Sequence, residues 1–221
     1  MTSFTESDSM ALTGRHDYEN MLCWLPEIDT NYYGIPEIKG ITELPEDAYF
    51  TNSEFLRKNK DYNSWCMFYE YDYKFERVWK QPKRQAKWLS NFKGAISPNF
   101  SVYIDIPLAM ALWSVYKARW CGAYWESLGI PVIPDVSWGN KNTWDFCFEG
   151  LPKNSIVSVQ DVGNHEDGWI RDLWLDGFNE MIKRLEPSKI LIYGAKAKDL
   201  PEYNIQYINA KVNNKTVLGK E

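Results

Sequence analysis

Lys189-Ile190-Leu191-Ile192-Tyr193 is the stretch that decides the fold class, and Ser155-Ile156-Val157-Ser158-Val159 is a second apolar run upstream of it. Both runs are rich in β-branched residues, and turn-forming residues bound them, as is typical of buried strands. The segment between them carries large apolar residues at three- and four-residue spacing, which predicts an amphipathic helix: Trp174, Phe178, Met181 and Leu185. Strand, helix and strand in this order indicate a βαβ unit with parallel strands.

The same alternation continues toward the N-terminus. We expect strands at 67–69, 95–97, 132–133 and 204–208, a helical segment at 73–90 that Pro82 interrupts, a long helix from Pro107 to Leu128 before Gly129, and a helical turn at 144–148. This pattern predicts an α/β fold with a mainly parallel sheet of about five or six strands. The sheet is either an open doubly wound sheet or a partial (β/α) barrel, since a closed barrel needs eight strands.

The chain divides into three parts. Residues 65–211 form the α/β domain, residues 1–64 a loop-rich N-terminal extension packed on it, and residues 212–221 a polar tail. The extension is expected to be loops because proline and glycine interrupt residues 22–51 repeatedly.

Composition excludes several classes of protein. The 221 residues carry a formal net charge of −5, which argues against a surface that binds nucleic acid or anionic lipid everywhere. No run approaches the roughly 18 apolar residues of a membrane span, and the N-terminus does not resemble a signal peptide. The four cysteines lie far apart and predict reduced thiols, so we expect a cytoplasmic protein without a membrane partner. The 11 Trp and 14 Tyr exceed what a core needs and favour a pocket or an interface.

Polar residues follow the predicted strands, where both alternative sheets bind their ligands. The candidate catalytic residues are Asp135, Asp161 and Asp105, and the candidate ligand-binding residues at the same edge are Ser101, Trp138 and Tyr193. We predict that Asp135, Trp138 and Asp161 line one pocket, with Ser101 and Tyr193 at its margin. Carboxylates held close together separate into an acid and a base, or bind a cation. The alternative is that these side chains only cap helices and form turns.

Two further residues carry hypotheses of their own. Arg119 lies on the long predicted helix and is a candidate for binding an anionic ligand. Its alternatives are a buried ion pair or a stem that reaches solvent. His165, in a loop with acidic neighbours, is a candidate general base, and the alternative is an exposed turn before the next helix.

A basic strip follows helical spacing and is a candidate for nucleic-acid contact: Arg77, Lys80, Arg84 and Lys87. Trp79 and Trp88 interleave with it and would stack bases. The favoured alternative is a solvated helix face above two core tryptophans, and Pro82 weakens the idea of a single face. The chain lacks the phosphate-binding, dinucleotide-binding, nucleophile-elbow and zinc-protease motifs, which argues against those enzyme classes.

Several segments together resemble a known family. These are Ser97–Ser101, Asp105 with Pro107, Tyr116–Trp120, Val132–Trp138, Phe146–Pro152 and Tyr193 with Gly194. They resemble the family catalogued as domain of unknown function 4417, over about residues 65–195, with Val132–Trp138 as the most specific part. The resemblance implies a phage or mobile-element protein, chiefly of Gram-positive bacteria, and implies no activity. The family pattern commonly has Asp at the position of Asn99, so a carboxylate is missing here, which argues against a metal-dependent mechanism.

Two functional hypotheses follow. The first is a phage or mobile-element protein that acts on a nucleotide or nucleic acid in a polar, aromatic-lined pocket at the strand ends. The second is a non-catalytic protein that binds a host or phage protein through an exposed aromatic surface. The sequence names no cofactor and no metal site, and leaves open whether the protein is an enzyme.

Overall fold

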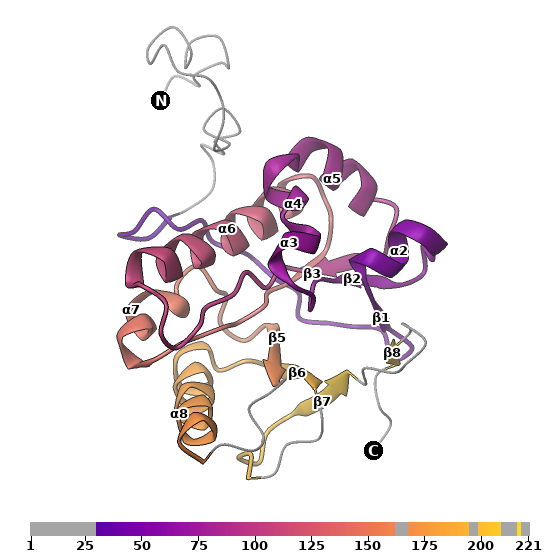
Figure 1. The fold of residues 1–221 in the computed structure, drawn as a ribbon. Helices are drawn as coiled ribbons and strands as arrows, with labels where there is room; N and C mark the ends of the chain where they lie inside the picture. Colours follow the sequence, from indigo (N-terminus) through magenta and orange to yellow (C-terminus); the bar gives the residue numbers. More distant parts are fainter. Residues whose placement is uncertain (1–29, 162–167, 195–198, 209–215, 218–221) are drawn as a thin grey trace, which may run out of the picture.

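The structure is a computed structural model, and it describes residues 30–161, 168–194, 199–208 and 216–217 (Figure 1). The strands are β1 (Tyr49–Asn52), β2 (Trp65–Met67), β3 (Gly94–Ile96), β4 (Val132–Ile133), β5 (Ile156–Asp161), β6 (Lys189–Gly194), β7 (Ile205–Ile208) and β8 (Thr216–Val217). The helices are α2 (Ser53–Asn59), α3 (Asp72–Phe75), α4 (Arg77–Lys80), α5 (Pro82–Leu89), α6 (Leu108–Ser127), η2 (Lys141–Thr143), α7 (Trp144–Cys147) and α8 (Gly168–Leu185). The α/β prediction is confirmed.

The strands follow one another in sequence order across the molecule. One sheet has the order β4-β3-β2-β1-β8 and a second has the order β5-β6-β7, with every pair parallel except β1 and β8. A parallel bridge between Asp135 and Ser158 joins the chain after β4 to β5, and Val136 N–H donates to Ser158 O at 2.8 Å. The order from β1 to β7 therefore lacks the reversal of a doubly wound sheet and is the order of a (β/α) barrel. Within the described residues β1 and β7 do not pair, so the sheet is open.

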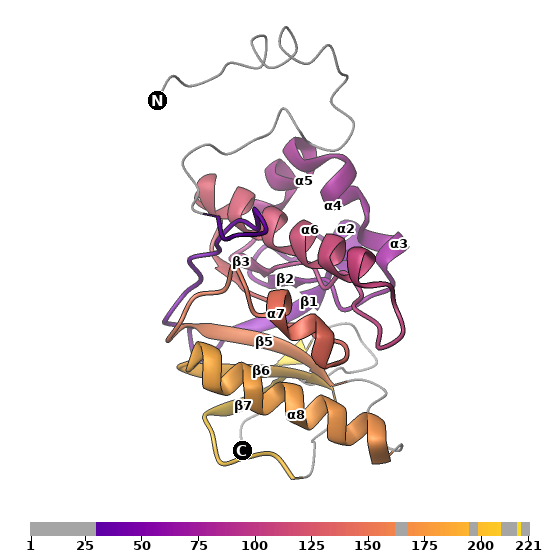
Figure 2. The ribbon, with the colours of Figure 1, turned by 90° about the vertical axis from the view of Figure 1, so that its left-hand side faces the viewer.

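The two faces of the curved sheet differ in what covers them. One face forms a shared apolar interior to which every strand from β1 to β7 contributes: Phe50, Trp65, Met67, Ile96, Ile133, Ile156, Leu191 and Ile208. The opposite face packs against helices, with β2 to β4 against α4, α5 and α6, and with β5 and β6 against α8. Figure 2 shows these helices on the outer sides of the molecule with the strands between them. Side chains alternate between the two faces along each strand.

The helix boundaries that were predicted from proline and glycine residues agree with the structure. Pro107 precedes α6, and Gly129 follows it with a φ of +80°, a conformation that glycine adopts readily. Pro82 divides the predicted 73–90 helix, as expected, and opens α5 as its first residue. In the described part of the chain, no helix has both the length and the apolar character that crossing a bilayer requires.

The expectation of loops throughout residues 22–51 is wrong in one place. Residues 49–52 form β1, and α2 follows at once. The four-residue strand is too short for a periodic pattern, and the prolines and glycines before it dominate the local signal. β1 also depends on distant partners, since it pairs with β2 on one side and with β8, within the predicted polar tail, on the other.

Candidate functional site

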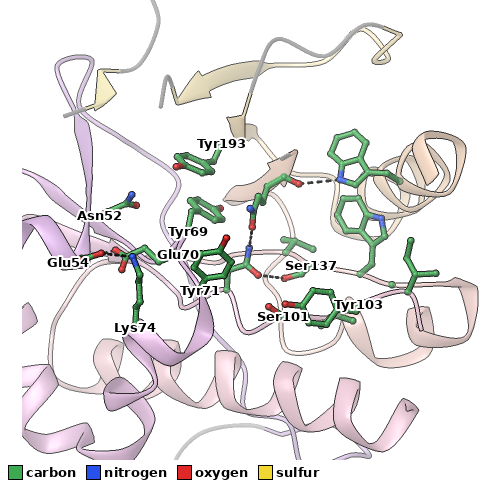
Figure 3. Close-up of a pocket in the computed structure, with 18 of the residues that line it drawn as sticks. Asn52, Glu54, Tyr69, Glu70, Tyr71, Lys74, Ser101, Tyr103, Ser137 and Tyr193 are labelled. Carbon is green, nitrogen blue, oxygen red and sulfur yellow. Dashed lines mark hydrogen bonds and ion pairs between the residues drawn. The ribbon is translucent and has the colours of Figure 1, made fainter. Parts of the chain in front are cut away.

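A pocket of about 1170 Å³ opens at the carboxyl ends of the parallel strands. Each strand from β1 to β6 contributes a lining residue at its carboxyl end or within four residues beyond it, in the order Asn52, Tyr69, Asn99, Ser137, Gln160 and Tyr193. Figure 3 shows side chains from separate strands converging there. This is the edge at which barrel-type and open parallel sheets bind their ligands.

The alternation of side chains along each strand explains why the pocket is polar above an apolar interior. On β2, Trp65 and Met67 face the interior, and Tyr69 follows on the same face two residues later. Ile156 faces the interior from β5, and Gln160 follows it on the same face at the end of the strand. The same strands thus supply both the core and the lining of the site.

Asp135 lies directly under this pocket and is only 1 % exposed. Its Oδ1 accepts a hydrogen bond from the Tyr69 hydroxyl at 2.9 Å, and its Oδ2 accepts one from the Ser137 hydroxyl at 2.8 Å. Burial raises the pKa of this carboxyl to about 6, although those two hydrogen bonds and the charge of Arg119 act in the opposite direction. A carboxyl with a pKa near neutrality, linked to a pocket through one hydroxyl, is able to take up or release a proton there.

Tyr69 connects Asp135 with the neighbouring strands. Its ring stacks on that of Tyr193 with centroids 4.5 Å apart and planes 9° apart, an arrangement visible in Figure 3. Its hydroxyl also lies 2.6 Å from the Ser158 hydroxyl on β5. Burial, together with the charge of Asp135, raises the pKa of Tyr69 well above its ordinary value. Tyr69 therefore remains a neutral hydrogen-bond donor at physiological pH.

A row of polar side chains crosses the pocket from β4 to β5. The Ser137 hydroxyl has one hydrogen, which it donates to the ionised Asp135 carboxylate at 2.8 Å, or to Oδ1 of Asn99 at 3.3 Å when Asp135 is protonated. Nδ2 of Asn99 donates to Oε1 of Gln160 at 2.7 Å. The backbone carbonyl of Gln160 accepts from Nε1 of Trp174 at 3.2 Å. The amide of Asn99 thus has a neighbour at each end, whereas the side chain of Gln160 is held through its oxygen; both line the pocket.

The aromatic end of the pocket is made by Trp138 and Trp174, whose ring centroids are 5.6 Å apart. Trp138 lies against α8 at Gly177, where a Cβ atom would come within 2.1 Å of Nε1 of the indole. Glycine at position 177 is therefore the reason that Trp138 fits between α8 and the pocket.

Replacing Gly177 with Ala is expected to displace the Trp138 indole, because the added methyl group and the ring cannot occupy the same space. Overpacking of this kind typically costs about 1–3 kcal/mol. Thermal denaturation and the near-ultraviolet circular dichroism of tryptophan measure both effects. Gly168→Ala is the matched control on the same helix, since no atom of the described residues lies within 4 Å of a Cβ there. Equal effects of the two substitutions would contradict the proposed fit.

The other end of the pocket carries charges of both signs. Lys74 forms an ion pair with Glu54 at 2.8 Å, and Lys58 lies nearby on α2. Glu70 accepts a hydrogen bond from the backbone N–H of Glu54 at 3.0 Å, and burial raises the pKa of its carboxyl. Figure 3 shows Lys74 beside both glutamates. Within the described ranges, no group of three or more His, Cys, Asp and Glu side chains is placed to hold a metal ion.

The structure brings together some of the predicted site residues. Ser101, Asp105, Trp138 and Tyr193 line the pocket. Ser101 also anchors its own loop, because its hydroxyl donates to Oδ1 of Asp72 at 2.8 Å. Asp105 is exposed at the edge. Their ligand-binding and catalytic roles remain predictions.

Asp135 and Asp161 do not share the predicted pocket, because they lie on opposite faces of the sheet. Asp135 pairs with Ser158 on the interior face, whereas Asp161 follows Ser158 by an odd number of residues and therefore points outward. There Asp161 is fully buried and forms an ion pair with Arg171 of α8 at 3.2 Å. Neither carboxylate lines the pocket, although Asp135 reaches it through Ser137.

Arg119 is placed in the interior instead of at the pocket. Its side chain is among the largest fully buried ones, and the guanidinium donates to three backbone carbonyls, those of Glu149, Asp135 and Cys147, at 2.9–3.1 Å. Burial lowers its pKa to about 10, so it stays charged at neutral pH. The structure therefore gives Arg119 a connecting role between α6, the end of β4 and α7.

The basic strip is divided between α4 and α5. Lys80, Arg84 and Lys87 are exposed, while Arg77 is half-buried and donates to the backbone carbonyl of Lys74. Trp79 is 5 % exposed and packs in the core, so it is not available to stack on bases. The contact of this strip with nucleic acid stays a prediction, and His165 lies outside the described residues.

The sequence analysis did not single out Tyr69 or Gly177. The signal for Tyr69 was present, because residues 65, 67 and 69 alternate onto one face. No local signal marks Gly177, since its importance comes from a tryptophan on another element.

The hypothesis that the protein binds another protein through an exposed aromatic surface also stays a prediction. Large exposed apolar side chains, which such a surface needs, occur at the start of α6, namely Leu108, Met110 and Trp113.

Comparison of the sequence with known proteins identifies its family. The sequence profile described as "Domain of unknown function (DUF4417)" matches residues 27–210. A protein called "Gene 1 protein" of Mycobacterium phage L5 is 36 % identical over 178 residues, which cover 77 % of this chain and 76 % of the relative. The "Gene 1 protein" of Mycobacterium phage D29 is 34 % identical over 182 residues, which cover 82 % of this chain and 67 % of the relative. No solved structure matches significantly. The chain therefore belongs to the DUF4417 family and is related over most of its length to phage proteins.

Proposed function

We propose that the protein binds a nucleotide, free or within a nucleic acid, in the pocket at the strand ends. The observation that carries the proposal is the combination of aromatic rings at Trp138, Trp174 and Tyr193 with the side-chain amides of Asn99 and Gln160 in one pocket. Nucleobases present flat faces that stack on aromatic rings and edges that hydrogen-bond to amides.

The remaining features of the pocket agree with a ligand that carries a phosphate group and include a residue able to accept a proton. Lys58 and Lys74 lie at the end away from the tryptophans, where a phosphate group would find cations. Asp135, linked to the pocket through Ser137, is the residue best placed to accept a proton from a bound substrate. The relatives are phage proteins, and phages depend on nucleotides and nucleic acids for replication, which supports the proposal.

The test is a titration of tryptophan fluorescence with the four nucleoside 5′-monophosphates and with single-stranded oligonucleotides. Trp138→Leu is expected to weaken binding about tenfold, in line with the loss of one base stacking contact. Trp113→Leu is the matched control, because Trp113 is exposed on α6 and does not line the pocket. Saturable binding that Trp138→Leu weakens and Trp113→Leu leaves unchanged supports the proposal. Absence of binding to every nucleotide and oligonucleotide would overturn it and favour the interaction hypothesis.

A further inference from the structure

The row of polar side chains across the pocket has a direction. The direction is set by its last hydrogen bond, in which Nδ2 of Asn99 donates to Oε1 of Gln160, while Oδ1 of Asn99 faces the hydroxyl of Ser137, which also contacts the buried Asp135. Each amide thus turns its oxygen toward the preceding residue in the row. Because an amide has its oxygen and nitrogen at opposite corners, this order leaves the amino group of Gln160 at the end of the row.

The amino group of Gln160 is the part of the row that remains for a ligand. Among the residues that the structure describes, no hydrogen bond to Nε2 of Gln160 is present, while the side chain is half-buried and lines the pocket. The nearby acceptor at the same position, the Gln160 backbone carbonyl, already accepts from Trp174. The end of β5 therefore offers donors to a bound ligand.

We infer that Gln160 selects nucleobases that present a carbonyl oxygen to it, the keto group of guanine, uracil or thymine, over the amino group of adenine or cytosine. The inference rests on the proposed nucleotide binding and names the class of base. A carbonyl accepts from the amide –NH₂, whereas an exocyclic amino group would face it donor to donor. Such a mismatch in a pocket leaves polar groups unpaired, which is the basis of strong discrimination.

Two pairs of ligands isolate this difference. IMP, which has the 6-carbonyl of guanine without its 2-amino group, differs from AMP at position 6 of the purine, and UMP differs from CMP at position 4 of the pyrimidine; each pair exchanges a carbonyl for an amino group together with the protonation of the adjacent ring nitrogen. The dissociation constants of the wild-type protein are measured for all four by tryptophan fluorescence. We expect the keto member of at least one pair to bind about tenfold more tightly, as for one well-placed hydrogen-bonding pair.

Gln160→Glu is the decisive variant, because it keeps the shape of the side chain and replaces the donor by an acceptor. It is expected to lose the preference or reverse it, and the ratio within a pair cancels any general effect of the added charge. Gln81→Glu is the matched control, since Gln81 is exposed on another element. If Gln160→Glu fails to fold, Ser137→Ala replaces it as the test, because it removes the hydroxyl that orients Asn99 and should reduce the preference.

The outcomes separate this inference from the proposed function. Binding of all four monophosphates with equal affinity within each pair overturns the inference and leaves nucleotide binding standing. A keto preference that Gln160→Glu, or Ser137→Ala in its place, leaves unchanged overturns it too. A failure of every nucleotide to bind overturns both. A preference for the keto base that falls in Gln160→Glu, or in Ser137→Ala in its place, and persists in Gln81→Glu supports the inference.

Discussion

Replacing Arg119 with Met is expected to lower the free energy of unfolding by about 3 kcal/mol or more, because three backbone carbonyls lose their donor and each buried one left unpaired costs about 1–3 kcal/mol. The guanidinium donates to the backbone carbonyls of three separate residues, and the side chain is 2 % exposed. Methionine fills much of the same volume and supplies no donor. Urea denaturation at pH 7 measures the loss.

Arg84→Met is the matched control for this experiment. Arg84 is exposed on α5, so its replacement should change stability by no more than about 0.5 kcal/mol. A stable Arg119→Met variant that has lost ligand binding would contradict the structural role and restore the hypothesis that Arg119 binds an anionic ligand.

Replacing Asp135 with Asn is expected to stabilise the protein by up to about 3 kcal/mol at pH 8. The folded pKa of about 6 exceeds the ordinary value of 3.8, so ionising this carboxyl costs more in the folded state than in the unfolded state. Asparagine is neutral, and its amide is able to accept from Tyr69 and donate to Ser137, as a protonated carboxyl does.

The pKa of Asp135 is raised in the folded state, and this direction determines how stability depends on pH. Between about pH 4 and pH 6 the folded state holds a proton that the unfolded state has lost, so the wild-type protein becomes less stable as pH rises through this window. The advantage of Asp135→Asn should therefore be greatest above pH 6 and vanish below about pH 4. Denaturation at pH 4, 6 and 8 measures it, with Asp105→Asn, an exposed carboxylate, as control. A variant less stable than the wild type at pH 8 would show that the ionised carboxylate stabilises the fold.

Much of the fold was predictable because its elements carry local signals. The apolar strands β5 and β6, the proline before α6 and the proline that divides α4 from α5 are all visible in the sequence. The edge of the sheet at which the pocket opens was also predictable from the sequence, since parallel strands present their carboxyl ends on one side. β1 could not be predicted, because its four residues are held by partners far away in the chain.

The predicted pairing of Asp135 with Asp161 failed for a reason the sequence partly contained. Strand alternation places Asp161 on the face opposite Ser158, but the register between the chain after β4 and β5 was needed to place Asp135 beside Ser158. Burial of Arg119 and the fit of Trp138 against Gly177 depend on packing between distant elements. Periodicity within one element carries no information about such contacts.

The sequential strand order also bears on how the protein is made. Because each parallel strand from β2 to β7 pairs with the strand that precedes it, or in the case of β5 with the segment that follows β4, successive βαβ units can assemble as the chain leaves the ribosome. The outer edge of β1 is the exception, since it pairs with β8 at residues 216–217, which follow β1 by more than 160 residues. That edge waits while the residues between β1 and β8 are synthesised, and until β8 arrives it exposes unpaired backbone groups that favour association between nascent chains.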